Sequence, residues 1–191
     1  MIYDCGIYDL RLWGVANCTM LDLPNRGTKT ISNMLTFDEN GFLTPTQVIP
    51  VTLELLENEL VVTIGTVTRR RLFEKLVKYL DDLKALVGAE ITVWINGSYA
   101  TKKPNPADID IVAFVPWRKM EELSLAIKPF TYPAAFGNYG VDSYLVRVYE
   151  PEHKNHILTH SDRLHWLHDF CTTQPNRQGK TFKKGFLEIR Y

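Results

Sequence analysis

Two short motifs in the middle of the chain carry residue types that could bind phosphate and a metal ion. Gly97 and Ser98 form the first motif, and Asp108 and Asp110 form the second. Glycine lets the backbone approach a ligand closely, and successive N–H groups with a serine hydroxyl donate to phosphate oxygens. Two carboxylates aimed at one point repel unless a cation joins them, and Mg²⁺ prefers one or two carboxylates with waters and substrate phosphates. The motifs predict a site for magnesium and a nucleoside triphosphate.

Two apolar runs, residues 91–95 and 111–115, flank the motifs and must position them. Their β-branched and aromatic residues, bounded by Gly, Pro and Asn, predict buried strands. Alternate residues of a strand share a face, so we expect Asp108 and Asp110 to point together, away from the core. Each motif alone is usually a turn or a solvated strand end. Their order and strand context together favour a functional site.

The runs Gly-Ser-Tyr-Ala at 97–100 and Asp-Ile-Asp-Ile-Val at 108–112 resemble the signature of the DNA polymerase β-like nucleotidyltransferase superfamily. The resemblance is strongest to its small bacterial members, the minimal nucleotidyltransferases, and covers residues 72–149. More loosely, segments 37–45 and 184–189 resemble an uncharacterised bacterial branch of that superfamily. The resemblance implies transfer of a nucleoside monophosphate from an NTP such as ATP to a hydroxyl. It leaves the acceptor open: a protein, an RNA end or a small molecule such as an aminoglycoside.

The family pattern also implies a third carboxylate on a later strand. Residues 141–149 are rich in strand formers, and Asp142 stands at their start. Without the accompanying motif it would be read as a turn residue. The resemblance implies that Asp108, Asp110 and Asp142 are catalytic and hold two Mg²⁺ ions, with Mn²⁺ as a possible substitute. Asp142 would also help to deprotonate the acceptor hydroxyl, while Gly97 and Ser98 would hold the phosphates.

The loop between the two motifs departs from the family pattern. Many relatives follow Gly-Ser-x-Ala with Arg-Gly, whereas residues 101–106 are Thr-Lys-Lys-Pro-Asn-Pro here. Lys102 and Lys103 could bind the phosphates, since lysine serves as a point charge for phosphate. The alternative is a solvated lysine pair on a surface loop. The two prolines restrict the residues before them to extended conformations.

The composition is that of an ordinary globular protein. The chain has 191 residues, of which 45% are hydrophobic and 23% charged. Its 22 basic and 22 acidic residues give a formal net charge of zero, so the bulk composition does not indicate the broad basic face of a dedicated duplex-binding protein and leaves only a local basic patch open. The apolar runs are too short for a membrane span and the start is not a signal peptide, so we expect a cytoplasmic protein with no membrane partner. The 3 widely spaced cysteines fit neither a disulfide framework nor a paired-cysteine zinc site.

The elements predict an α/β fold of the α+β kind, a nucleotidyltransferase fold with a mixed, mostly antiparallel sheet backed by helices. We expect one nucleotidyltransferase-like domain over residues 37–191, after an extension of uncertain structure over residues 1–36. The clearest helix has apolar residues at helical spacing from Leu72, a Thr66 or Thr68 cap, and Gly88 at its end. Other helices are expected between 46 and 64, over 118–127 and from 161 onward.

Three sets of basic residues have two readings each. Arg69, Arg70 and Arg71 open the clearest helix, where positive charge opposes the helix dipole; a solvated face is favoured over contact with nucleic acid or an acidic partner. Five histidines between 153 and 168 lack an accompanying zinc signature, which favours a structural or surface role. The basic residues around Gly179 and Gly185, Lys184 among them, are read as a solvated tail, with contact to a triphosphate or RNA as the alternative.

Two other classes of function remain open. An antitoxin-like or regulatory binding module would keep the nucleotidyltransferase fold and act through a partner such as a helical toxin; the three acidic positions argue against it. A nucleotide-sugar glycosyltransferase would use the Asp-x-Asp pair for metal, but it leaves the Gly-Ser turn unexplained. Among acceptors a protein ranks first, because the chain is short for recognising tRNA by itself.

Overall fold

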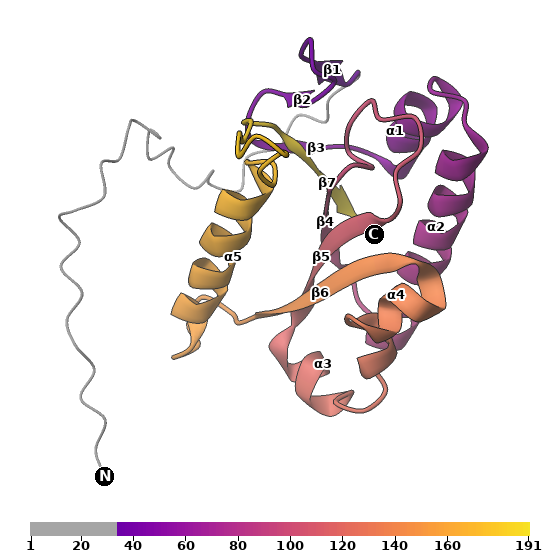
Figure 1. Ribbon diagram of the computed structural model, residues 1–191. Helices are drawn as coiled ribbons and strands as arrows, with labels where there is room; N and C mark the ends of the chain where they lie inside the picture. Colours follow the sequence, from indigo (N-terminus) through magenta and orange to yellow (C-terminus); the bar gives the residue numbers. More distant parts are fainter. Residues whose placement is uncertain (1–33) are drawn as a thin grey trace, which may run out of the picture.

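A five-stranded mixed sheet in the order β3-β7-β4-β5-β6 forms the centre of the molecule (Figure 1). The computed structural model describes residues 34–191; residues 1–33, which hold most of the expected extension over 1–36, lie outside the described residues. The five strands are β3 (Val48–Pro50), β4 (Thr92–Asn96), β5 (Ile109–Pro116), β6 (Val141–Val148) and β7 (Phe186–Arg190). A separate two-stranded sheet pairs β1 (Thr36–Phe37) with β2 (Leu43–Thr44).

Helices fill the connections between the strands, and the expected α/β class is confirmed. In chain order they are α1 (Leu53–Glu57), η1 (Asn58–Val62), α2 (Val67–Val87), α3 (Trp117–Glu122), η2 (Lys128–Phe130), α4 (Ala134–Tyr139) and α5 (His156–Phe170). Parallel and antiparallel pairings are equally represented in the central sheet, which is therefore mixed without an antiparallel majority. The long crossover through α3, η2 and α4 brings β6 back parallel to β5, as parallel strands require.

The predicted long helix is confirmed as α2. The Thr66 hydroxyl accepts from the Arg69 N–H at its start, and Gly88 ends it in the left-handed conformation, with φ 68°. The helix expected between residues 46 and 64 is wrong at its start, because Pro50 ends strand β3 there and the α1–η1 helical run begins at Leu53. The helix expected over 118–127 ends at Glu122. Helix α5 begins at His156, before the predicted Ser161.

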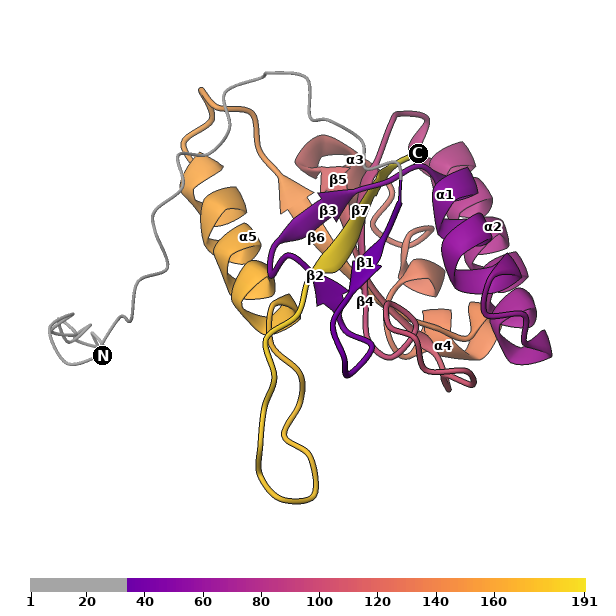
Figure 2. The same cartoon turned by 90° about the horizontal axis from the view of Figure 1, so that it is seen from above.

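The central sheet has an apolar core on each face. Side chains of β5 that pack with α2 are Ile109, Ile111, Ala113 and Val115. Side chains of β5 that pack with Trp94 and Phe170 are Val112 and Phe114. Figures 1 and 2 show α1 and α2 on one side of the sheet and α5 on the other. Because Asp108 and Asp110 alternate with the α2-facing residues, they lie on the α5 face.

No helix within residues 34–191 is both long enough and apolar enough to cross a membrane.

Candidate functional site

The three aspartates predicted from the sequence lie together where β4, β5 and β6 run side by side. Asp110 of β5 is in register with Asn96 of β4 on one side and with Asp142 of β6 on the other. Asp108 directly precedes β5 and is two residues before Asp110, so continuing the alternation of the strand would put both side chains on the same face. Burial raises the pKa of Asp110 to about 6, and repulsion from Asp108 and Asp142 adds to that rise. The sheet therefore gathers all three carboxyl groups.

Asp142 has an oxygen that the surrounding protein leaves unsatisfied. Its Oδ1 is buried and, like Oδ1 of Asn96, has no hydrogen-bond partner. Burial, and then the charge of Asp108, raise the pKa of the Asp142 carboxyl. A buried acceptor without a donor is costly, and a cation beside it would remove that cost. The Asp142 carboxyl group therefore has the environment expected of a group that binds a metal ion.

The fit of this site to a divalent ion depends on how many protein ligands the ion needs. Within the described part of the chain, no group of three or more His, Cys, Asp or Glu side chains is arranged to hold a metal by itself. Mg²⁺ commonly takes one or two carboxylates and completes its shell with water and substrate phosphates. The unpartnered oxygen of Asp142 and the crowded charge at Asp110 fit an ion shared in that way with a polyphosphate.

The Gly97 turn lies directly against the carboxylates. Gly97 has φ 70°, in the left-handed region, and a Cβ added there would overlap Oδ2 of Asp110. Ser98 is half-buried, and its carbonyl accepts a hydrogen bond from the Thr101 hydroxyl at 2.8 Å. Position 97 requires a glycine for two independent reasons, conformation and space. The predicted phosphate-binding turn and the predicted metal-binding pair are thus contiguous.

The structure adds a buried cation that the sequence did not indicate. The side chain of Lys184 is only 4% exposed, and its Nζ donates to the Gly97 carbonyl at 3.2 Å. Burial lowers the pKa of Lys184 to about 8, and the nearby Asp110 carboxylate opposes that lowering. The interpretation of Lys184 as part of a solvated tail is wrong. Its only sequence signal is a position just before an apolar strand, which ordinary surface lysines share.

The two lysines predicted to bind phosphate lie on an exposed loop. The Lys102 ammonium lies 5.0 Å from the centroid of the Phe37 ring, and its backbone N–H donates to Gly41. Lys103 accepts hydrogen bonds from Arg69 through its carbonyl oxygen. The loop is therefore fixed by its backbone, while both ammonium groups remain on the surface. Their part in phosphate binding stays a prediction.

Arg69 is fully buried beneath this loop, so its interpretation as part of a solvated face is wrong. Its guanidinium donates to the carbonyls of Leu60 and Tyr99 at 3.1 and 3.0 Å, and to those of Thr101 and Lys103. Arginine suits this place because five donors in a rigid plane can serve several carbonyls at once. Arg69 thereby ties the loop that follows the Gly-Ser turn to helix α2.

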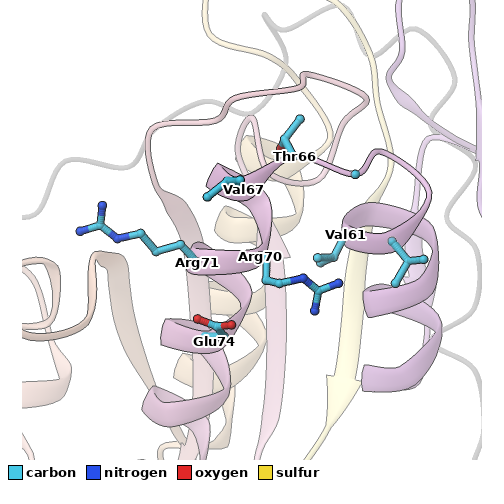
Figure 3. A pocket seen from close by; sticks show the side chains of 8 residues that line it. Val61, Thr66, Val67, Arg70, Arg71 and Glu74 are labelled. Atoms are coloured by element: carbon cyan, nitrogen blue, oxygen red, sulfur yellow. The ribbon is translucent and has the colours of Figure 1, made fainter.

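The other two arginines line a pocket of about 350 Å³ between η1 and the first turns of α2. Figure 3 shows Arg70 extending toward the helix that carries Val61, whereas Arg71 extends the opposite way. Arg70 forms an ion pair with Glu57 at 3.3 Å. The pocket belongs to the helical layer on the α2 side, away from the face that carries the aspartates, and is not part of the site.

The histidines fall into two groups along α5 and the turn before it. His156 contacts the Tyr149 carbonyl through Nδ1 at 2.8 Å, and its Nε2 lies 2.9 Å from Nε2 of His160. His165 and His168 each lie near a carboxylate oxygen of Asp169. These contacts hold the start and the last turns of α5, and none of them involves the three site aspartates.

A family model matches residues 35–190, and its description is a family of unknown function, DUF6932. The chain belongs to the DUF6932 family. The match includes every residue of the site built above, from the Gly97 turn to Lys184. Searches among curated proteins and among solved structures gave no match for this DUF6932 protein. Its function must therefore be argued from the site.

Proposed function

We propose that this DUF6932 protein is a magnesium-dependent nucleotidyltransferase of the kind that its sequence resembles. The observation that carries the proposal is the register of the sheet, which sets Asp110 and Asp142 side by side on neighbouring strands. Asp108 lies beside them, and the Gly97 turn abuts the Asp110 carboxylate. One end of the sheet, where β4, β5 and β6 meet, thus offers oxygen ligands for a metal next to backbone N–H groups for a phosphate.

In the proposed reaction an acceptor hydroxyl oxygen attacks the α-phosphorus of an NTP. A new oxygen–phosphorus bond forms, the bond from the α-phosphorus to the oxygen bridging to the β-phosphate breaks, and pyrophosphate leaves. Asp142 would accept the proton of the hydroxyl. The N–H groups of the Gly97–Ser98 turn and the Ser98 hydroxyl would hold the leaving phosphates, with Lys184 supplying positive charge behind the turn.

Asp108, Asp110 and Asp142 would hold the metal together with phosphate oxygens of the NTP. Mg²⁺ bound there would supply stabilisation of the charge that develops on the leaving pyrophosphate and lower the pKa of the acceptor hydroxyl. NTPs and Mg²⁺ are both met in the cytoplasm, where we propose that the protein acts.

A transfer assay tests the proposal. The full chain is incubated with each of four α-³²P-labelled NTPs, Mg²⁺ and cell lysate, and label in protein and RNA is measured. We expect transfer by the wild type and by Asp162→Asn, an exposed aspartate on α5, and none by Asp108→Asn. If no NTP gives transfer while the protein forms a stable complex with a neighbouring gene product, the proposal is wrong and a non-catalytic binding module takes its place.

A further inference from the structure

Three aromatic side chains, Tyr132, Tyr144 and Trp166, form a continuous row beside the aspartates, which we call the aromatic strip. The ring centroids of Tyr132 and Tyr144 are 6.5 Å apart with planes 14° from parallel, and those of Tyr144 and Trp166 are 4.9 Å apart. Tyr132 is 55% exposed and Tyr144 43% exposed, while Trp166 is half-buried. The strip therefore presents a large aromatic surface to solvent.

The scaffold fixes the strip in place. Tyr144 belongs to β6, which runs between α5 and α4 (Figure 1). Trp166 packs against Phe170, a core residue of the α5 face, with centroids 5.5 Å apart. The Tyr132 N–H donates to the Ser143 carbonyl at 2.8 Å. A ligand that stacks on rings held this way loses little free energy to ordering the protein.

The strip adjoins the carboxylates on the side away from the phosphate-binding turn. Tyr144 follows Asp142 by two residues on the same strand, so both side chains leave the same face. Burial raises the pKa of Tyr144, and the charge of Asp142, then Tyr132 and then the charge of Asp110 add to that rise. Across the sheet the order is the Gly97 turn after β4, Asp110 on β5, then Asp142 and Tyr144 on β6.

This order has a consequence for the two substrates. In phosphoryl transfer the attacking and leaving oxygens are roughly in line through the phosphorus. If pyrophosphate leaves at the Gly97 turn, the acceptor oxygen approaches from the β6 side. The aromatic strip therefore lies where the acceptor must bind.

We propose that the aromatic strip stacks the bases of a single-stranded RNA whose terminal ribose hydroxyl is the acceptor. This proposal rests on the proposed function for the direction of approach. Aromatic side chains stack bases regardless of sequence, at about 1–3 kcal/mol per base. The ribose oxygen would form a phosphodiester bond to the α-phosphorus, with pyrophosphate leaving and the hydroxyl proton passing to Asp142.

The same contacts disfavour a peptide acceptor that adds a strand to the sheet. A peptide bound in that way would need free backbone groups along the outer edge of β6. The Ser143 carbonyl, between Asp142 and Tyr144, already accepts from the Tyr132 N–H. What the surface offers at this point is exposed aromatic side chains, on which flat bases can stack.

Binding of a fluorescein-labelled RNA octamer, followed by anisotropy without NTP, tests the proposal. We expect Tyr144→Ala and Tyr132→Ala each to weaken binding at least about fivefold, the lower limit for loss of one stacked base. Tyr144→Phe, which keeps the ring, should bind within about twofold of wild type by the same reasoning. Leu164→Ala is the control for loss of exposed apolar surface on α5, since Leu164 is 63% exposed and lies on another side of the helix from Trp166. Duplex RNA of the same sequence should bind more weakly than the single strand.

Three results would overturn the aromatic strip as an RNA site: no measurable binding of the octamer by the wild type, equal binding of duplex and single strand, or unchanged binding by folded Tyr144→Ala and Tyr132→Ala. Folding of each variant is checked by its melting temperature. The titration and the transfer assay, both carried out on the wild type, together separate the two proposals. If the wild type binds RNA but transfers no label, only the proposed function is contradicted. If the wild type transfers label to protein but binds no RNA, only the assignment of the aromatic strip as an RNA site is contradicted.

Discussion

At Asp110, burial and the like charges of Asp108 and Asp142 act together on one carboxyl group. A carboxyl group whose folded pKa exceeds its unfolded value of about 3.9 destabilises the folded state progressively as pH rises between the two values. For Asp110, with a folded pKa of about 6, the whole destabilisation is present above pH 6 and absent near pH 4. The site thus holds a carboxylate that the folded protein alone does not favour, as expected of a group that binds a cation.

Asp110→Asn should therefore raise the free energy of unfolding at pH 8 by about 2 kcal/mol, and by much less at pH 4.5. Urea unfolding at the two pH values in the presence of EDTA measures this difference. Asp162→Asn, which changes an exposed aspartate, should show no such difference between the two pH values. A loss of stability in Asp110→Asn at pH 8 would contradict the electrostatic account.

Gly97→Ala tests the contact between the turn and the carboxylate. Gly97 and Gly88 have nearly equal φ values, 70° and 68°, but only Gly97 has the Asp110 carboxylate where a Cβ would lie. Gly88→Ala should lose about 1 kcal/mol of stability for the left-handed backbone, and Gly97→Ala about 1–3 kcal/mol more. Thermal unfolding measures the difference. Equal losses of stability in the two variants would show that an added Cβ at position 97 does not clash with the Asp110 carboxylate.

At the scale of elements, the loop after the Gly-Ser turn owes its shape to a side chain of another element. Arg69 of α2 donates to carbonyls at both ends of that loop, Tyr99 and Lys103. Buried carbonyls that lose a charged donor each lose about 1–3 kcal/mol of favourable interaction. The loop is thus part of the α2 packing unit, although the sequence separates the two.

Arg69→Met should destabilise the protein by about 3 kcal/mol or more and raise amide hydrogen exchange in residues 99–104. Arg70→Met, next to it in the chain, removes only an exposed ion pair with Glu57 and should change stability by less than about 1 kcal/mol. Unaltered exchange in the loop of Arg69→Met would show that the loop holds its shape without the guanidinium.

The sequence predicted the parts of the site that depend on local pattern. The alternation around Asp110 and the strand formers after Asp142 were sufficient to place both residues on strands. Their register, which sets Asp110 beside Asp142, is not specified by any local pattern and comes from the fold. Arg69 and Lys184 could not be predicted in the same way, because each lies in a run of basic residues that normally faces solvent. What buries them is a set of carbonyls and a carboxylate brought close by distant segments.

At the scale of the whole molecule, ligand binding should couple to global unfolding. A ligand at 100 times its Kd stabilises a protein by about 2.7 kcal/mol, and for a chain of this size that raises Tm by about 5–10 °C. We expect this rise when Mg²⁺ and the preferred NTP are added together to the wild type or to Asp162→Asn. Asp108→Asn should show a much smaller rise in differential scanning fluorimetry. An equal rise in Tm in Asp108→Asn would show that the nucleotide binds away from the three aspartates.

Strand β7 lies between β3 and β4, although its residues follow those of every other strand in the chain. During synthesis on a ribosome, the other strands of this sheet therefore emerge first, with a gap between β3 and β4. The gap closes only when residues 186–190 arrive, and Lys184 reaches the Gly97 turn in the same event. The nascent chain consequently lacks the complete proposed site until nearly all of the described residues are made, and it exposes two unpaired strand edges that chaperones can recognise until then.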